Sequence, residues 1–348
     1  MKVGAILGPR VDTPAQIELA EELGYERAWV FDSPALFADP WMTLARAADR
    51  TSRIRLGVSV ITPRMRHLIA NAGAIATLAA LAPGRVDVVI GAGFTSQAMI
   101  GKGPVRWREV EEYTVALRAL LRGEAIDWDD GVVALRPGRL TGLAVPCEVP
   151  IWVAAHGPKG YAVGARVGDG IVTNPGHGSG DGTDHGVALW AQFNATVLAA
   201  GEGLDSERVI DAGGPPAALH LHLGEGGAAR GTAEASAYAE RLEAIDPRVR
   251  HLEMHRGHLA EVTDLERDLV TAELIARTTS TGTPEQVKAN VAAIAAEGFA
   301  GILYAPMGPD VPRELRVMAE LLELGDQIAD PGAGEAGRPE VEGAERDV

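Results

Sequence analysis

The amino-acid sequence predicts an α/β fold, a (β/α)8 TIM barrel with inserted segments. Short apolar runs that fit buried strands alternate with longer stretches of helical periodicity, and the alternation gives eight strand and helix pairs. The stretch from Arg53 to Phe94 reads as strand, crossover helix and strand, which implies parallel pairing. The first strand is followed by GPRVD, which lacks the glycine fingerprint of a dinucleotide-binding fold. One barrel therefore fits the chain better than two doubly wound halves.

Each predicted strand is a short apolar run, several of them rich in β-branched residues, bounded by small or polar residues. The seventh strand is predicted from the alternation of apolar residues with His220 and His222, which is the pattern of a strand with one polar face. The eight expected strands cover residues 3–7, 28–31, 54–60, 86–90, 151–154, 170–173, 217–223 and 301–305.

Helices are expected where apolar residues recur at helical spacing and glycine or proline marks an end. One helix is well delimited, because Thr283 fits an N-cap, Pro284 the first helical position and Gly298 the end. The stretch DWDDGVVALRPGRL is interpreted as an inserted hairpin around an Asp-Asp-Gly turn, and HLEMHRGHLAEV has no assignment. The other expected helices cover residues 14–23, 40–50, 68–79, 107–122, 187–200, 232–244 and 312–324, with shorter ones after AAHGPKG and near Glu273.

Composition and charge limit the partners. The chain has 348 residues, with 32 basic against 48 acidic side chains, and its formal charge of −16 repels phosphate backbones and anionic membrane surfaces. We expect no nucleic acid and no membrane as a partner. A single cysteine, Cys147, excludes an internal disulfide framework, and the first residues do not resemble a signal peptide, so a cytoplasmic enzyme is expected.

The predicted domain organisation is one barrel domain over residues 1–325 followed by a tail. From Asp326 onward the chain carries seven acidic residues and two arginines among small residues and proline. Such a segment has too little apolar surface to form a core. We therefore expect residues 326–348 to be an acidic, disordered tail.

The carboxyl ends of the strands hold the candidate functional residues, because ligand chemistry in parallel barrels collects there. The ends of the third and fourth strands are Ser59 to Thr62 and Gly91 to Phe94. Gly91 and Gly93 fit either close ligand approach or simple relief of crowding. Asp32 ends the second strand and fits either a catalytic role or a cap for the segment that follows.

Several motifs together resemble one known family. They are ELGYERAWVFDSP with DPW after it, TSRIRLGVSVITPRMRH, GRVDVVIGAGF, EEYTVALRALLRGE, VPIWVAAHGPKG with DGIVTNP, and TGTPEQV. In these stretches the chain resembles the luciferase-like flavin-dependent oxidoreductase superfamily, in its methylenetetrahydromethanopterin reductase-like branch. The resemblance covers about Val3 to Leu324. It implies a barrel, usually dimeric, that holds FMN or the deazaflavin coenzyme F420 at the carboxyl ends of the strands and acts on a small-molecule substrate.

The resemblance also implies roles for individual residues. Ser59 and Val60 match a non-prolyl cis peptide behind the cofactor ring, and Thr62 matches a threonine that contacts the cofactor. The turn of Ala154, Ala155, His156 and Gly157 matches a segment along the cofactor, and Asn174 with Gly176 matches the loop after the next strand. We expect backbone N–H groups from His156 to Gly160 to face the cofactor phosphate, with Lys159 and His177 nearby. The remaining cofactor-binding candidates are His67, Gly91 and Gly93.

Two departures from the family pattern narrow the chemistry. The sugar-phosphate dehydrogenase branch has histidine directly after the strand-two aspartate and glutamate at the end of strand four, whereas this chain has Ser33 and Phe94. Its acid-base pair is therefore missing. We expect Asp32 and Ser33 to be the catalytic candidates and the substrate to be largely apolar, a carbonyl or an imine rather than a sugar phosphate.

The cofactor is expected to be F420, with FMN as the alternative. The chain has 28 arginines against four lysines, the coding bias of a high-GC genome, in which F420 is frequent. F420 implies hydride transfer, whereas FMN would allow a luciferase-like monooxygenase. A non-catalytic flavin-binding protein is the alternative from another class, because the histidine and glutamate are absent.

The histidines suggest a further alternative, a zinc hydrolase. His251, His255 and His258 have H-x3-H-x2-H spacing, and His220 and His222 lie on the predicted seventh strand. No tight pair of metal ligands ends the first strand, however, as a metal-dependent barrel hydrolase would need. The sequence therefore favours surface or individually satisfied histidines, and no metal site is expected.

Overall fold

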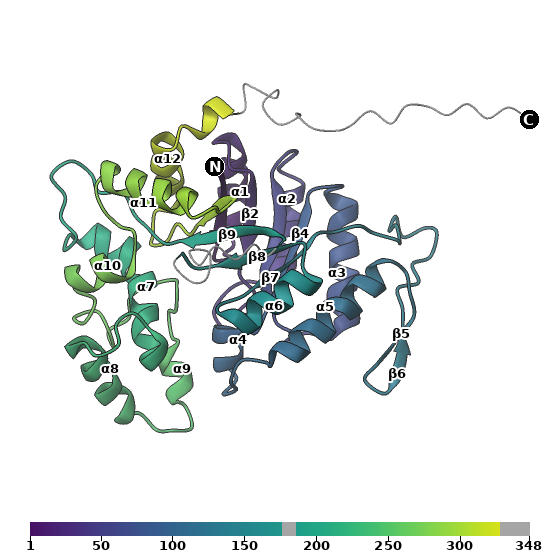
Figure 1. Ribbon diagram of the computed structural model, residues 1–348, viewed down its shortest axis with the longest axis horizontal. Helices are drawn as coiled ribbons and strands as arrows, with labels where there is room; N and C mark the ends of the chain where they lie inside the picture. The colour runs from purple at the N-terminus through teal and green to yellow at the C-terminus, as the bar shows by residue number, and fades with distance from the viewer. Residues whose placement is uncertain (176–185, 328–348) are drawn as a thin grey trace, which may run out of the picture.

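The computed structural model describes residues 1–175 and 186–327, and at its centre eight parallel strands close into a barrel (Figure 1). The order around the barrel is β1-β10-β9-β8-β7-β4-β3-β2, so the predicted (β/α)8 barrel is confirmed. The strands are β1 Lys2–Leu7, β2 Arg27–Val30, β3 Arg55–Ile61, β4 Val86–Gly91, β7 Ile151–Ala154, β8 Gly170–Thr173, β9 Ala188–Phe193 and β10 Gly301–Tyr304.

Helices on the outside of the barrel bury their apolar faces against the strands. The N-cap predicted at Thr283 is present at the start of α11, and Gln286 completes a capping box there, because the two residues exchange side-chain to backbone hydrogen bonds. The main core lies between this layer of helices and the strands. The helices are α1 Thr13–Glu22, α2 Pro40–Ala48, α3 Leu68–Leu81, α4 Phe94–Ala98, α5 Trp107–Leu121, α6 Pro158–Val167, α11 Pro284–Ala296 and α12 Val311–Leu321.

The interior of the barrel contains charged as well as apolar side chains. The Arg27 guanidinium lies 4.0 Å from the ring centroid of Trp190 and 5.2 Å from those of Trp29 and Trp152. Asp87 on β4 accepts hydrogen bonds from Arg55 and, at 3.3 Å, from Trp29 Nε1. The buried carboxylate therefore has charged and polar partners from β2 and β3, as a buried charge requires.

The predicted hairpin is confirmed. β5 Ile126–Trp128 and β6 Gly131–Val133 pair antiparallel, and the turn residues Asp129 and Asp130 have φ values of 48° and 61°. Two left-handed turn residues are the geometry that suits the twist of a two-residue hairpin.

Two predicted elements in the second half of the chain are wrong. Residues 187–200 were expected to be helical, but Ala188–Phe193 is strand β9 of the barrel. Residues 217–223 were expected to be the seventh strand, but they lie at the end of helix α7, Glu207–His222, and just after it. Ala218, Leu221 and His222 are buried at i, i+3 and i+4 spacing, so the alternation of apolar residues and histidines also satisfied a helical pattern.

A helical insertion lies between β9 and β10, to one side of the barrel (Figure 1). It has its own hydrophobic cluster, in which Leu221, Tyr238, Val262 and Ile275 are buried. Its elements are α7, the 3-10 turn Gly224–Gly226, α8 Ala233–Glu243, α9 Arg250–Met254 and α10 Ala272–Thr278. A short 3-10 turn, Leu324–Gln327, follows α12. Residues 328–348, nearly all of the predicted acidic tail, lie outside the described residues, and the domain boundary at 325 stays a prediction.

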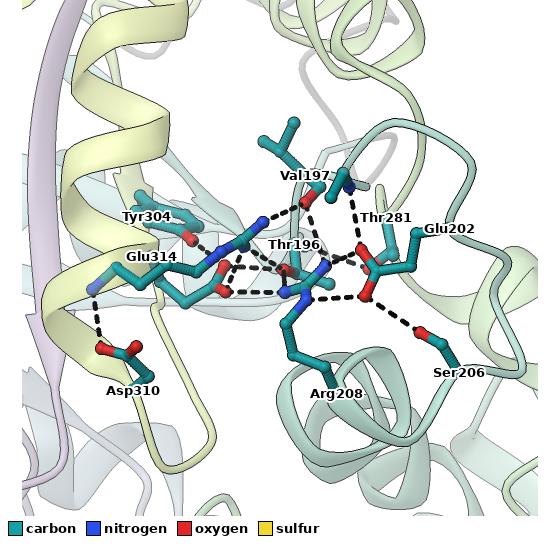
Figure 2. Close-up of polar contacts among 11 residues, drawn as sticks. Thr196, Val197, Glu202, Ser206, Arg208, Thr281, Tyr304, Asp310 and Glu314 are labelled. Atoms are coloured by element: carbon teal, nitrogen blue, oxygen red, sulfur yellow. Dashed lines mark hydrogen bonds and ion pairs between the residues drawn. The ribbon is translucent and has the colours of Figure 1, made fainter.

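A network of polar contacts joins this insertion to the barrel (Figure 2). The buried carboxylate of Glu314 on α12 accepts hydrogen bonds from Thr196 Oγ1 at 2.6 Å and from Tyr304 Oη at 3.2 Å. The guanidinium groups of Arg208, on α7, and Arg313 also contact Glu314. One carboxylate therefore links the loop after β9, strand β10 and the first turn of α7.

Glu202 extends the network from the loop before α7. Its carboxylate accepts from Arg208 Nε at 2.8 Å, from the backbone N–H of Ala199 at 2.8 Å and from Ser206 Oγ at 3.1 Å. The Arg208 hydrogen bond is the largest cause that lowers the pKa of Glu202 to about 2.

Among the described residues, no helix is long and apolar enough to cross a bilayer.

We expect Glu202→Gln to lower the free energy of unfolding by about 1–2 kcal/mol at pH 7, because the charged acceptor for Arg208 is lost. A carboxyl whose pKa is lower when folded stabilises the protein above its unfolded pKa and loses that effect as pH falls. The difference between variant and wild type should therefore shrink as pH falls from 4.5 towards about 2. Urea unfolding across this range measures it. Glu240→Gln, at an exposed position on α8, is the control; a pH-independent difference at Glu202 would contradict the assignment.

Candidate active site

The carboxyl end of β3 is irregular. The Ser59–Val60 peptide bond is cis, as the sequence resemblance predicted. Ser59 pairs with Val89 and Ile61 with Ile90, so Val60 has no partner in the β4 ladder. Such a bulge changes the direction of a side chain at the rim of a barrel. Ser59 is buried, whereas Val60 is half-buried.

Small residues form the rim of the barrel next to Val60. Gly91 at the end of β4 pairs in register with Ala154 at the end of β7. A Cβ atom on Gly91 would lie 3.0 Å from the Val60 side chain, so glycine leaves room for the bulge. Across β4 and β7 the rim therefore has no side chain larger than a methyl group, which leaves space for a flat ligand.

Gly93 and Thr62 depend on each other. Gly93 has a φ of 72°, in the left-handed region, and a Cβ atom there would lie 2.3 Å from Thr62 Oγ1. Thr62 is 1% exposed and its hydroxyl shares a 3.1 Å hydrogen bond with Ser96 Oγ. Glycine is therefore required at position 93 for both its backbone conformation and the space that Thr62 occupies.

Helix α6 begins at the same rim. Its N-cap, Gly157, has a φ of 81° and provides no side-chain cap, and Pro158 occupies the first helical position. The next two backbone N–H groups, of Lys159 and Gly160, have no partner within the helix, which is a general property of a first turn. Together with the exposed Lys159 side chain, this start suits an anion.

The other predicted residues of this segment lie at the same rim. Ala155 is buried and donates its N–H to the Val172 carbonyl at 2.9 Å, whereas His156 is exposed. Asn174 follows β8 directly and is half-buried. Gly176 and His177 lie outside the described residues.

Asp32 is buried and has an arginine partner. Its carboxylate oxygens lie 3.3 Å from Arg66 Nε and Nη2, and Arg66 also reaches Asp39 at 2.8 Å. Burial raises the pKa of Asp32 and the negative Asp39 raises it further, while Arg66 opposes both. Sequence reasoning missed Arg66, although it lies within the family-like stretch TSRIRLGVSVITPRMRH.

Ser33, the second catalytic candidate, is half-buried, and its hydroxyl makes no hydrogen bond within the described part of the chain. Because Asp32 is engaged with Arg66, Ser33 is the more accessible of the two candidates. Both catalytic roles stay predictions.

His67 is held by neighbours. Its Nδ1 accepts from the backbone N–H of Ile69 at 3.3 Å and caps α3, and its Nε2 lies 3.2 Å from Asp129 in the hairpin. The imidazole therefore connects α3 to the hairpin, and cofactor contact by His67 stays a prediction.

Three histidines lie together beside the rim. His222 from α7 and His255 and His258 from the segment after α9 are at most 6% exposed. The expectation of surface or individually satisfied histidines is wrong for this group, because all three are buried and His255 Nδ1 has no hydrogen-bond partner among the described residues. Burial and the nearby His222 and His251 lower the pKa of His255 to about 4. The spacing of His255 and His258 was visible in the sequence, but the position of His222 depended on the helix that was taken for a strand.

Phe94 packs against these histidines. Its ring centroid lies 5.6 Å from that of His255 and 6.4 Å from that of His258, and its side chain is still 38% exposed. Leu259, next in sequence to His258, packs against the interior cluster of the barrel, a hydrophobic cluster that includes Trp29, Val89 and Leu303. Phe31, Val60 and Ala154 pack against the same cluster. The insertion therefore contributes an apolar residue to this end of the barrel, which sequence reasoning missed.

A cavity of about 450 Å³ opens at the other end of the barrel, where Lys2, Arg27, Trp152 and Trp190 line it. It lies at the amino ends of the strands, and Arg27 there already contacts Glu26 and Asp87. We place the functional site at the carboxyl end, because the small-residue rim, the bulge and the start of α6 meet there.

Comparison with known proteins gives consistent matches. The sequence model of the luciferase-like monooxygenase family matches residues 8–301. The F420-dependent glucose-6-phosphate dehydrogenase of Beutenbergia cavernae is 36% identical over 185 residues, 48% of this chain and 53% of that protein. The 5,10-methylenetetrahydromethanopterin reductase of Archaeoglobus fulgidus is 25% identical over 329 residues, 87% of this chain and 92% of that protein.

The first curated relatives match over limited lengths, since the chain spans about half the length of each. Among solved structures, the coenzyme F420-dependent tetrahydromethanopterin reductase of Methanopyrus kandleri superposes with a TM-score of 0.66 at 18% identity, covering 92% of this chain and 97% of that one. This likeness shows a shared fold, and the resemblance noted from the motifs is confirmed.

We expect Gly93→Ala to lower the free energy of unfolding by about 2–4 kcal/mol, because the new methyl group meets Thr62 and the backbone is left-handed. Two controls separate these causes. Gly84 has a φ of 71° and open space where a methyl group would lie, so Gly84→Ala measures the effect of the left-handed backbone alone. Gly103 has open space and no left-handed φ, so Gly103→Ala should change the free energy of unfolding little. Urea unfolding of the three variants measures the differences. If Gly93→Ala lowers the free energy of unfolding no more than Gly84→Ala does, a methyl group at position 93 makes no close contact with Thr62.

Proposed function

Because the chain belongs to the luciferase-like monooxygenase family, we propose that it is an oxidoreductase that binds coenzyme F420 and transfers a hydride between it and a small organic substrate. The cofactor would lie at the carboxyl end of the barrel. The alternative within the family is an FMN-dependent monooxygenase.

The observation that carries this proposal is the rim formed by Gly91 and Ala154 beside the uncapped start of α6. A flat ring needs a wall without large side chains, and a phosphate needs backbone N–H donors and a cation. The two features lie next to each other, since Gly157 and Lys159 follow Ala154 within five residues. The residues therefore fit a cofactor that combines a flat ring with a phosphate, as F420 and FMN both do.

F420 is preferred over FMN because the curated relative with 36% identity is named as F420-dependent. The description of the family as monooxygenases supports the FMN alternative. When bound, F420 supplies or accepts the hydride. The side chains of this chain would then orient the substrate, exclude water and provide a proton or hydrogen bond to its reacting oxygen or nitrogen.

Ser33 is the residue we assign to that hydrogen bond. Ser33 lies in the segment that follows β2, and its hydroxyl has no hydrogen-bond partner within the described part of the chain. Asp32, its neighbour in sequence, is buried and paired with the half-buried Arg66, so we assign Asp32 to positioning rather than to contact with the substrate. A serine has no suitable pKa for removing a hydroxyl proton. The reaction that fits best is therefore reduction of an uncharged carbonyl or imine.

Oxidation of a sugar phosphate is not part of this proposal, although one relative carries that name. Residues 33 and 94 are serine and phenylalanine, so the acid-base pair expected for sugar phosphates is missing. Phe94 and Leu259 add apolar surface near the rim, which favours a substrate that loses its water on binding.

The proposal includes a homodimer that acts in the cytoplasm. The family resemblance supports the dimer, and the single half-buried cysteine is compatible with a reducing compartment. Light scattering on purified protein would measure the oligomeric state.

Binding of the cofactor tests the site directly. We expect Lys159→Ala to weaken F420 binding by about 3–10-fold, because one cation near the phosphate is lost. The same variant should bind the phosphate-free deazaflavin core as wild type does, so fluorescence titration with both compounds separates the phosphate from the ring. Lys288→Ala, on the distant helix α11, is the control. Equal loss for both compounds would contradict the phosphate assignment.

Turnover distinguishes the candidate functions. We expect reduced F420 to be consumed with ketones or imines at rates that do not depend on oxygen, and glucose 6-phosphate to give no reduction of oxidised F420. Ser33→Ala should lower kcat by about 10–100-fold with little change in F420 affinity. Oxygen-dependent consumption of reduced FMN would support the monooxygenase instead. Bound cofactor with no turnover on any substrate would favour the non-catalytic flavin-binding protein.

A further inference from the structure

We propose that His222, His255 and His258 bind one divalent transition metal ion, with Zn²⁺ as the best match, and that this ion fixes the helical insertion to the barrel. This proposal replaces the sequence-based expectation of no metal site. It does not depend on the proposed cofactor, because none of the three side chains belongs to the rim assigned to it.

The distances suit a single ion. One ligand nitrogen from each histidine lies within 4.8 Å of the others. The Nδ1 atoms of His222 and His258 are 2.7 Å apart. Ligand nitrogens around a tetrahedral Zn²⁺ with bonds of about 2.0–2.1 Å lie about 3.3–3.4 Å apart. A small opening of the pair would therefore be enough to admit the ion.

The neighbours of two histidines orient them for binding through Nδ1. Glu266 Oε2 accepts from His222 Nε2 at 2.8 Å, and Thr95 Oγ1 lies 3.0 Å from His258 Nε2. Glu266 is itself fixed by the backbone N–H of Thr263 at 3.3 Å. A carboxylate behind a histidine is the usual second partner in zinc sites, where it selects the tautomer and raises the basicity of the ligand.

His255 gives an independent reason to expect a ligand. A chain of hydrogen bonds from Glu266 through His222 and His258 to Thr95 accounts for both nitrogens of those two rings without any ion. His255 Nδ1 has no hydrogen-bond partner among the described residues. Water does not reach it either, because the side chain is only 1% exposed. A buried nitrogen of this kind is unfavourable unless something binds it, and a shared ion would do so.

The surroundings select the class of metal. Tyr238 stacks on His222 with ring centroids 5.5 Å apart, and Phe94 covers His255. Three imidazoles in such an apolar environment suit Zn²⁺, Ni²⁺ or Co²⁺, whereas Mg²⁺ and Ca²⁺ need oxygen ligands. Three protein ligands leave one position of a tetrahedral ion for a small non-protein ligand.

The position of the cluster indicates what the ion would stabilise. His222 comes from α7, the other two ligands come from the segment after α9, and Thr95 belongs to α4 at the end of β4. Leu259 follows His258 with a φ of 59° and packs against the interior cluster of the barrel. The ion would therefore hold Leu259 and the insertion in place beside the active site.

Metal analysis of untagged protein, purified without a metal-affinity column, tests the proposal. We expect elemental analysis to find about one transition metal ion per chain, and chelator-treated protein to rebind Zn²⁺ and to give the visible absorption of tetrahedral Co²⁺. His255→Gln should weaken Zn²⁺ binding at least about 100-fold, and Glu266→Gln about 10–100-fold. His251→Gln, on α9 and outside the cluster, should bind as wild type does.

Thermal unfolding with and without added Zn²⁺ makes the test independent of folding defects. Zn²⁺ should raise the Tm of chelator-treated wild type and of His251→Gln, and should leave that of His255→Gln unchanged. Far-UV circular dichroism shows whether each variant is folded. If folded wild type binds no Zn²⁺, Co²⁺ or Ni²⁺, or if His251→Gln loses as much affinity as His255→Gln, the proposal is overturned.

Discussion

Parallel closure of the barrel is the constraint on which the rest of the structure depends. Because all eight strands run in the same direction, their carboxyl ends meet at one rim, and every loop that follows a strand begins there. The bulge at Val60, the pair of Gly91 and Ala154, and the start of α6 are far apart in the sequence, yet closure makes them neighbours. The composition of a few strand ends therefore decides which ligand the rim can accept.

Two buried carboxylates, Asp87 and Glu314, each have partners from several elements. Asp87 links β2, β3 and β4 inside the barrel, and Glu314 links α12 to β10, the loop after β9 and α7. Removing one partner of such a group leaves an unpaired buried charge, which costs more than the intact pair contributes. The Glu314 network helps to hold the insertion where it presents Leu259 and three histidines next to the rim.

Much of the fold was predictable from the sequence, because the strand ends and helix starts in the first half carry glycine, proline and capping residues. The cis bond, the hairpin and the cap at Thr283 follow from local patterns or the family resemblance. The errors lie where one pattern fits two structures. AALHLHL satisfies both a two-residue and a helical period, and the burial of Ala218, Leu221 and His222 shows that tertiary packing selected the helix.

The partners of the candidate site residues were much less predictable, because they come from distant segments. No local signal joins Asp32 to Arg66, His67 to Asp129, or His222 to His258. The zinc alternative was rejected because no tight pair of metal ligands ends the first strand, a criterion that does not apply to a cluster between the insertion and α4. Side-chain pairing of this kind depends on the register and spacing of elements that only the closed barrel defines.

Hydrogen exchange of backbone amides with and without F420 tests the central claim most directly, because it locates the bound cofactor without assuming any reaction. The account predicts that F420 slows exchange in the segments 59–65, 91–97 and 154–161, which meet at the carboxyl rim, and leaves the segments that line the opposite cavity near Lys2 and Arg27 unchanged. Protection confined to that amino-terminal cavity, or no protection at saturating F420, would contradict it.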